Sequence, residues 1–304
     1  MPETQSLVSA ATRIVRRNKR YVVWFYLMNL LFAWWGATAF AIHAHSMLDN
    51  SLYADRLVRG FDLAVLLEML GRPEFGPMRA STVPAMVFAV VFFVASLLFM
   101  PGVLLGYASD HRIPGEEFYR ACGRNLWRFV RLFLFFAIVA GVVVGILGAA
   151  EGALVEAADK TSYERLPFLT DVISLAIIGL LLTLGRIWFD IAQTDAVLRD
   201  QPAARKSLLS GFRLLRGNVG RLLGAYIVMA VVALFVLAAG VYLWHVMVPS
   251  SSVFGAFLVS QATVLLLLTT RFWQRAAAVS FYLRKLAEPS GESATAEAMA
   301  APVS

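Results

Sequence analysis

Three histidines and one aspartate lie where predicted membrane helices end, and histidine is a side chain that could bind a metal or a haem there. His43, His45 and His245 fall at the outer ends of apolar stretches, and Asp171 lies near the start of another. Imidazole binds several transition metals, and paired transmembrane histidines can hold haem. His43 and His45 are two residues apart, however, so a regular helix cannot turn both toward one ligand. We therefore predict neither a metal site nor a cofactor.

The sequence also lacks the patterns that indicate the common kinds of enzyme. It has no Gly-x-Ser-x-Gly nucleophile elbow, no His-Glu-x-x-His zinc motif, no phosphate loop and no Gly-x-Gly-x-x-Gly. Cys122 is the single cysteine, which excludes an intramolecular disulfide and a cysteine-built metal site. We predict no catalytic residue, and an integral membrane enzyme is the least favoured function.

Two amides are the most deeply placed polar side chains of the apolar stretches. Asn29 and Gln261 each need an interhelical partner, which is worth about 0.6–2 kcal/mol in a membrane. They can bond to each other, to Ser260 or to Thr263, or they can line a polar path. No Asp, Glu, Lys or Arg lies near the middle of any apolar stretch. Since buried ionisable residues mark proton relays and ion pathways, this pattern disfavours a proton-coupled pump.

The elements that must position these side chains are membrane helices. The 304 residues are 59% hydrophobic and 15% charged, with a mean hydropathy of +0.70, whereas soluble domains are about 45–50% apolar and about 25% charged. A helix needs about 20 apolar residues to cross a bilayer. We predict an all-α membrane domain over 21–287, preceded by a basic amphipathic segment over 1–20 and followed by a disordered tail over 288–304. Six spans are predicted, at 21–42, 83–107, 129–150, 168–189, 222–244 and 253–273, with a further helix over 52–70.

The distribution of positive charge predicts how the spans are oriented. The side that holds both ends of the chain carries 21 of the 27 Lys and Arg residues, and the other side carries 6. Cytoplasmic loops are enriched in Lys and Arg. We therefore predict that both termini are cytoplasmic, and this asymmetry explains the net charge of +7 without nucleic acid.

A repeated pattern divides the six spans into three helical hairpins. Each odd-numbered span follows a basic amphipathic stretch, over 7–17, 116–124 and 203–216, and each stretch is followed by an asparagine, Asn18, Asn125 or Asn218. Two even-numbered spans end alike, in Arg186-Ile187-Trp188 and Arg271-Phe272-Trp273, 85 residues apart. We expect both of these helices to continue about three turns beyond the membrane. Basic residues at these borders are predicted to contact lipid headgroups or a partner: Arg128, Arg186, Arg213, Arg216, Arg221 and Arg271.

Two further features of the spans are a row of glycines and a proline. Gly141, Gly145, Gly148 and Gly152 share one helix face, where small side chains let another helix approach closely. We favour packing inside the membrane domain over homodimerisation. Pro101 predicts a kink in the second span, because proline removes a backbone donor and clashes with the preceding turn.

The stretch 203–226 resembles a recurring element of uncharacterised bacterial six-helix inner-membrane proteins. It is also similar to the membrane domain appended to some glycerophosphodiester phosphodiesterases, and the stretch 271–284 is similar too. The resemblance implies a bacterial plasma-membrane location and carries over no catalytic residue.

Two functions remain after these exclusions. The first is a non-enzymatic accessory or scaffold protein whose cytoplasmic basic helices dock anionic lipid or a protein partner, since each Lys or Arg near an anionic surface contributes about 1 kcal/mol. The second is a transporter or permease for an apolar or lipid-like substrate, using Asn29, Gln261 and Pro101. The lack of charge inside the spans favours the first, and a homo-oligomer is compatible with either.

Overall fold

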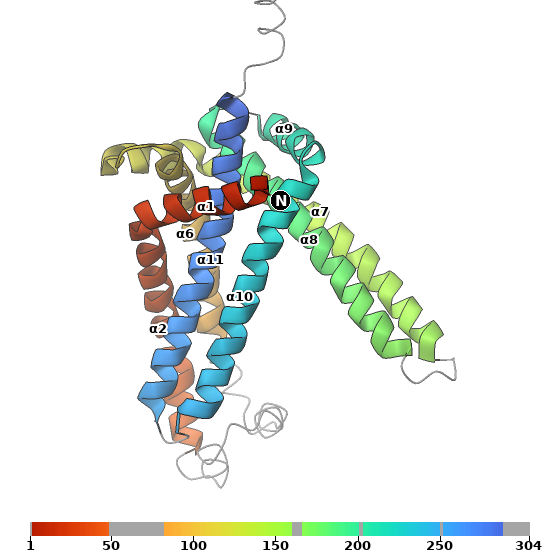
Figure 1. The fold of residues 1–304 in the computed structure, drawn as a ribbon. Coiled ribbons are helices and arrows are strands. Elements are labelled where there is room, and N and C mark those ends of the chain that lie inside the picture. Colours follow the sequence, from red (N-terminus) through yellow and green to blue (C-terminus); the bar gives the residue numbers. More distant parts are fainter. Residues whose placement is uncertain (1, 49–81, 160–165, 201–202, 250–251, 288–304) are drawn as a thin grey trace, which may run out of the picture. The chain divides into compact units, whose positions relative to one another are not determined.

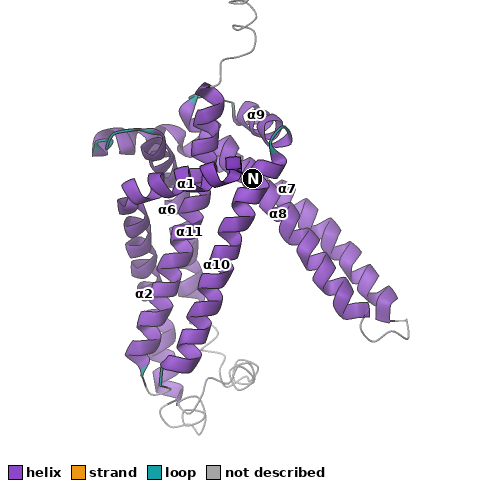
Figure 2. Cartoon of the chain, viewed as in Figure 1, coloured by secondary structure: helices purple, strands orange, loops and turns teal. Residues whose placement is uncertain are grey.

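The structure is a computed structural model, and it describes residues 2–48, 82–159, 166–200, 203–249 and 252–287. Within these residues every regular element is a helix (Figures 1 and 2). The predicted helix over 52–70 and the predicted disordered tail over 288–304 lie outside the described residues. The helices are α1 (Pro2–Arg17), α2 (Lys19–Leu48), α6 (Thr82–Ala108), α7 (Gly115–Asp159), α8 (Leu166–Leu198), α9 (Ala204–Arg216), α10 (Val219–Met247) and α11 (Val253–Ala287).

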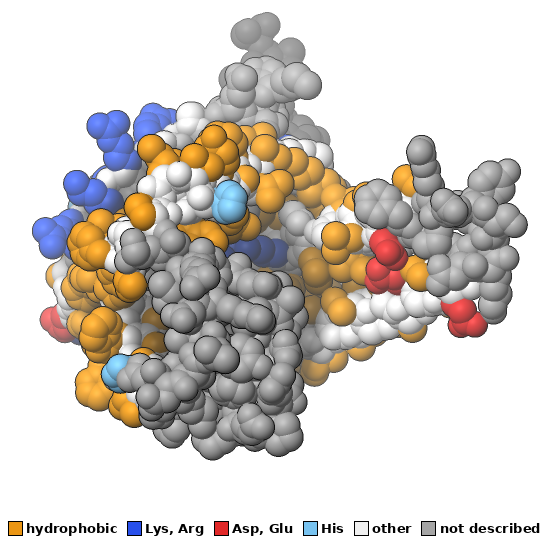
Figure 3. Space-filling view, turned by 90° about the horizontal axis from the view of Figure 1, so that it is seen from below, with side chains coloured by type: hydrophobic (Ala, Val, Ile, Leu, Met, Phe, Trp, Pro, Cys, Tyr) orange, Lys and Arg blue, Asp and Glu red, His pale blue; other side chains and the backbone are white. Residues whose placement is uncertain are grey.

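Five of the described helices are long and apolar enough to cross a membrane, which makes the chain a multi-pass membrane protein. They are α6, α7, α8, α10 and α11, and each contains one of the predicted spans. Large apolar side chains remain exposed along them, as expected for surfaces that face lipid (Figure 3). The remaining predicted span, 21–42, lies within α2, a single helix of 30 residues, and its membrane crossing stays a prediction.

The sequence stretches that precede the spans form helices in two different ways. α1 ends at Arg17 and α9 at Arg216, so both are separate from the helices that follow. The stretch 116–124, in contrast, is continuous with its span in α7, which is 45 residues long. At the end of α9, Gly217 donates its N–H to Arg213 O. Arg124 rather than a glycine directly precedes Asn125, whose side-chain amide donates to Ala121 O at 3.0 Å within the unbroken helix.

The described helices form two compact units, each considered by itself. The first comprises Met1–Arg16, Pro101–Val228 and Trp273–Ser304, and the second comprises Arg17–Met100 and Met229–Phe272. The division falls at Pro101 within α6, which stays one continuous helix. A kink at Pro101 stays a prediction.

In the second unit, α2 packs against α6 and α11. A Cβ added to Gly36 would lie 2.9 Å from the Ala85 Cα, so the two backbones touch. One turn earlier, the rings of Phe32 and Phe88 stack with their centroids 6.2 Å apart. Phe25 meets Phe272 of α11 edge to face at 5.1 Å. Close backbone approach at a glycine is how membrane helices gain van der Waals contact without a hydrophobic driving force.

In the first unit, α8 packs against both α7 and α9 (Figure 1). The common core is apolar and consists of Leu132, Ala192, Ala196, Ala204 and Leu208. Gly211 lets α9 cross α8 closely, because a Cβ there would lie 3.2 Å from Trp188 O. The predicted continuation of the fourth and sixth spans as helix is confirmed, since α8 runs to Leu198 and α11 to Ala287.

In the first unit, each stretch that precedes a span contacts the helix of another span, twice through a tryptophan hydrogen bond and once through a phenylalanine ring. Trp188 Nε1 of α8 donates to Leu208 O of α9 at 2.8 Å. Its sequence equivalent, Trp273 of α11, donates to Val8 O of α1 at 3.3 Å. Phe118 of α7 lies against Gly102 of α6, where an added Cβ would be 2.5 Å from its ring. The matched tryptophans therefore make matched hydrogen bonds.

Candidate functional site

Two buried carboxylates of α8 are the strongest polar feature of the first unit. Asp190 and Asp195 are 4% and 1% exposed, within a helix segment that is buried on all sides. Tyr226 of α10 donates its hydroxyl to Asp190 Oδ2 at 2.8 Å. Arg186 Nε lies 3.9 Å from the same oxygen, one helical turn away. A buried charge needs such partners, because a carboxylate without them is strongly disfavoured.

Asp195 connects three helices through one oxygen. Tyr282 of α11 donates to Asp195 Oδ1 at 2.6 Å, and Ser210 of α9 donates to it at 3.0 Å. Arg199 Nε lies 3.9 Å from this oxygen, and the Arg199 guanidinium stands over the Tyr282 ring at 5.8 Å. Charge-assisted hydrogen bonds of this kind are about twice as strong as neutral ones. The arrangement fastens α9 and α11 to α8 and leaves Oδ1 poorly placed to act as a general base.

The sequence analysis missed both carboxylates. Asp190 directly follows the predicted span 168–189 and Asp195 lies six residues beyond its end, so a search for charges near the middle of a span passes over them. The run 190–197 mixes four apolar with four polar residues, so its composition gives no local signal that all eight are buried.

The basic residues predicted to contact headgroups fall into two groups. Arg128 is largely buried and pairs with Asp200, Arg186 lies beside Asp190, and Arg221 stands over the Phe281 ring at 6.0 Å. These three are engaged within the first unit. Arg213, Arg216 and Arg271 are exposed. Headgroup contact stays a prediction for all six, and exposure favours the second group.

Asp200 follows the end of α8 in a conformation unusual for an aspartate. Its φ is 50°, in the left-handed region that Asp and Asn tolerate better than most residues. The hydrogen bond from Arg128 holds the pKa of Asp200 below its ordinary value, and the charge of Arg124, 3.5 Å away, acts in the same direction. Asp200 therefore joins the chain after α8 to the start of α7.

The deep amides have one defined partner. Tyr26 of α2 donates its hydroxyl to Gln261 Oε1 of α11 at 3.2 Å, which gives Gln261 the interhelical bond that was predicted. Ser260 and Thr263 instead donate to backbone carbonyls of their own helix. Asn29 is half-buried on α2, three residues after Tyr26. The bond to Tyr26 gives Gln261 a packing role in the second unit.

The glycine stripe of α7 faces away from α8. Gly141, Gly145, Gly148 and Gly152 are exposed, and an added Cβ at each would meet nothing within 4 Å in its unit. α7 turns Phe136 toward α8, where its ring stacks on Phe189 at 4.8 Å. Packing on the stripe stays a prediction.

The candidate metal residues are spread over the described helices. His45 is exposed on α2 and His245 on α10, Asp171 is exposed on α8, and the side chain of His43 lies outside the described part of the chain. Among the described residues, no group of three or more His, Cys, Asp and Glu side chains gathers to hold a metal ion.

α9 presents two different exposed surfaces besides its buried face. Leu209 and Phe212 are 56% and 52% exposed, and Arg216 continues them one turn later. We call Leu209, Phe212 and Arg216 the docking stripe. Lys206, Ser210 and Arg213 form a second line at helical spacing, turned toward the end of α8. We call these three the cavity stripe. α9 therefore exposes a mainly apolar edge, the docking stripe, next to a polar and cationic edge, the cavity stripe.

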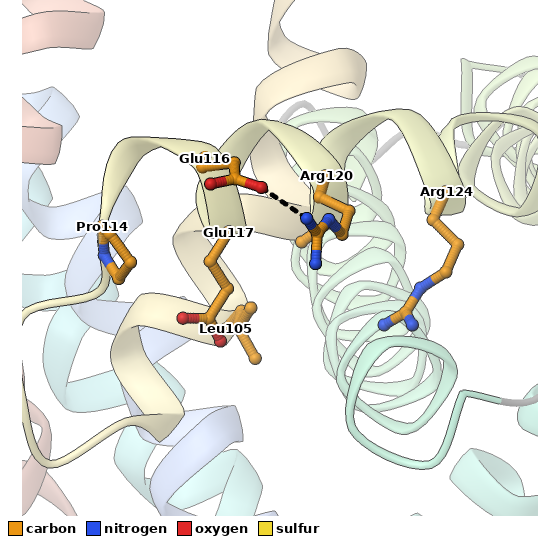
Figure 4. A pocket seen from close by; sticks show the side chains of 7 residues that line it. Leu105, Pro114, Glu116, Glu117, Arg120 and Arg124 are labelled. Carbon is orange, nitrogen blue, oxygen red and sulfur yellow. Dashed lines mark hydrogen bonds and ion pairs between the residues drawn. The ribbon is translucent and has the colours of Figure 1, made fainter.

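Two cavities of similar size lie in the first unit. One, of about 460 Å³, lies between the end of α8 and the cavity stripe of α9. The other, of about 450 Å³, lies between Leu105 of α6 and the start of α7 (Figure 4). Both fall in the size range of small-ligand sites. In the second cavity Arg120 pairs with Glu116 at 2.5 Å, and Glu117 and Arg124 also line it, so its lining holds two carboxylates and two cations.

The fold and these sites define a multi-pass helical membrane protein with a polar, basic set of helices beside its spans. The chain matches no known family, no characterised protein and no solved structure. The resemblance to bacterial six-helix proteins therefore stays a prediction.

Proposed function

We propose that the chain is a non-enzymatic accessory or scaffold protein of the bacterial inner membrane that docks its basic amphipathic helices on the anionic lipid surface. In this proposal six spans form three hairpins and both termini are cytoplasmic. The excess of Lys and Arg on one side supports the orientation. The matched contacts of Trp188 and Trp273 support the hairpin plan.

The docking stripe of α9 carries the proposal. A helix that buries one face on its own protein normally turns polar residues outward, yet α9 exposes more than half of Leu209 and of Phe212. Arg216 continues the stripe and is exposed too. Interfacial helices combine an apolar edge with flanking basic residues in this way, and they bind where headgroups meet acyl chains. Trp188, whose ring meets Phe212 edge to face, is typical of the same depth.

Hydrogen exchange of the α9 backbone tests the proposal. The full chain is placed in nanodiscs of phosphatidylcholine alone or with one fifth phosphatidylglycerol, and exchange is followed over residues 204–216. We expect exchange to be at least about threefold slower with phosphatidylglycerol, because docking stabilises the helix. High salt should remove the difference by screening.

The double variant Leu209→Ser/Phe212→Ser is the matched test of the apolar contribution, and it should lose the lipid effect while α10 exchanges as before. Equal exchange in both lipid mixtures would contradict docking on lipid. Protection seen only in native membranes would assign the stripe to a protein partner instead.

A further inference from the structure

The cavity between α8 and α9 gathers three cations from two helices. Arg199 reaches it from the end of α8, and Lys206 and Arg213 reach it from one edge of α9. Lys206 and Arg213 are seven residues apart, so they stand two turns apart on the same edge. The cavity therefore has a cationic wall along α9, and Arg199 of α8 adds a third cation to its lining.

The charge of this wall is not balanced by the other described residues that line the cavity. Asp195 is the one carboxylate among the lining residues, and its Oδ1 already accepts hydrogen bonds from Tyr282 and Ser210. Arg199 lies 3.9 Å from that oxygen. Among the described residues, no ion pair engages Lys206 or Arg213. Gathered like charges repel unless an anion binds between them.

The cavity at the start of α7 shows that the fold alone does not produce this charge. When Asn125 is aligned with Asn218, Arg120 matches Arg213 and Glu117 matches Ser210. The cavity at α7 thus has the same place in the repeated pattern and nearly the same size, but Glu116 and Glu117 neutralise its cations. Figure 4 shows Glu116 joined to Arg120 beside Glu117. Of these two cavities, the one at α9 has more cations than carboxylates among its lining residues.

We propose that the cavity between α8 and α9 binds a phosphate group, held by Arg199, Lys206 and Arg213. Guanidinium groups match phosphate oxygens with two parallel N–H donors, and a lysine adds a point charge. Leu209 and Leu214 line the same cavity and provide apolar surface for the organic part of a phosphate ester. This site goes beyond the docking stripe, because its cations lie on a different edge of α9.

Binding of inorganic phosphate tests the site. The full chain is kept in maltoside micelles, which contain no phosphate, and its unfolding midpoint is measured as phosphate replaces chloride at constant ionic strength. A ligand that binds only the folded protein raises the midpoint with its concentration. We expect Lys206→Gln and Arg213→Gln each to weaken apparent phosphate affinity about tenfold. The charge-preserving variants Lys206→Arg and Arg213→Lys should stay within about threefold.

The matched control is Arg120→Gln, the same substitution at the aligned position of the neutralised cavity. It should change phosphate affinity less than about twofold. The site is overturned if Arg120→Gln weakens phosphate binding as much as Arg213→Gln does. It is also overturned if neither phosphate nor phosphatidylglycerol raises the midpoint.

Adding phosphatidylglycerol to the micelles distinguishes the two sources of phosphate. If a lipid headgroup fills the cavity, the lipid raises the midpoint and the added phosphate has no further effect, and Arg213→Gln removes the lipid response. If the ligand is a soluble phosphate ester, the response to inorganic phosphate persists beside the lipid. Docking by the α9 stripe can fail independently, since it depends on Phe212, which does not line the cavity.

Discussion

Asp195→Ala is expected to lower the free energy of unfolding by about 3 kcal/mol. The substitution removes the acceptor of the Tyr282 and Ser210 hydroxyls, which are 2.6 and 3.0 Å from Asp195 Oδ1. Tyr282 is 1% exposed, so its hydroxyl would stay buried without an acceptor. Each charged hydrogen bond is worth about 1.5–3 kcal/mol, and an unsatisfied buried donor costs a similar amount. Unfolding by SDS in mixed micelles, followed by circular dichroism, measures the loss.

Asp171→Ala is the control for Asp195→Ala, since Asp171 lies on the same helix and is exposed. It should stay within about 0.5 kcal/mol of the parent. A double-mutant cycle of Asp195→Ala with Tyr282→Phe should show that the two losses overlap. If the two aspartate variants unfold at the same SDS fraction, Asp195 does not fasten these helices.

Gly36→Leu is expected to destabilise the packing of α2 on α6 by about 2–3 kcal/mol. A Cβ at Gly36 would lie 2.9 Å from the Ala85 Cα, which is a backbone atom and cannot swing aside. The helices must therefore move apart, and the stacked pair Phe32–Phe88 one turn away would be disturbed as well. Overpacking in a close-packed site typically costs about 1–3 kcal/mol. The same SDS titration measures this loss of stability, and Gly36→Ala should destabilise the protein less than Gly36→Leu.

Gly141→Leu on α7 is the matched control for Gly36→Leu. An added Cβ there meets nothing within 4 Å in its unit, and replacing a helical glycine gains up to about 1 kcal/mol of helix propensity. We expect no loss. A loss of 2 kcal/mol or more at Gly141 would indicate that another helix packs on the glycine stripe. Equal stability of both leucine variants and the parent would contradict the contact at Gly36.

Sequence patterns that depend on composition and on helical period were reliable for this chain. The apolar runs in α6, α7, α8, α10 and α11 are long enough to require helices in lipid, whatever their neighbours are. The continuation of α8 past Arg186 followed from the absence of glycine and proline before Arg199. The matched tryptophans were found from spacing, and their shared role as donors follows from one indole N–H needing one acceptor.

Features that depend on which helices meet were not predictable. Nothing local indicates that Tyr282 and Ser210 meet at Asp195, because the three residues come from three different helices. The partner of Gln261 was likewise Tyr26 of α2 rather than the predicted Asn29, Ser260 or Thr263. Gly36 resembles the stripe glycines of α7 in sequence, yet Gly36 touches another backbone and those four do not. A sequence pattern indicates which residues share a helix face, but the tertiary fold determines which other helix packs on that face.

The two exposed edges of α9 would let one short helix serve both proposed roles, docking on lipid and binding a phosphate group. The docking stripe offers apolar area with Arg216 at its end, which suits a lipid surface, and the cavity stripe offers cations to a single phosphate. The buried face, with Ala204, Leu208 and Leu215, anchors the helix to its unit.

The depth of residue 212 in a lipid bilayer tests docking most directly. In a Cys122→Ser background, Phe212→Cys carries a nitroxide label, and Leu286→Cys at the exposed end of α11 carries the reference label. The protein is placed in nanodiscs that contain phosphatidylglycerol, and collisions with oxygen and with a water-soluble nickel chelate are compared. We predict that the label at 212 is exposed to oxygen and shielded from nickel, while the label at 286 shows the reverse. Equal access of nickel to both labels would contradict docking of α9 on lipid.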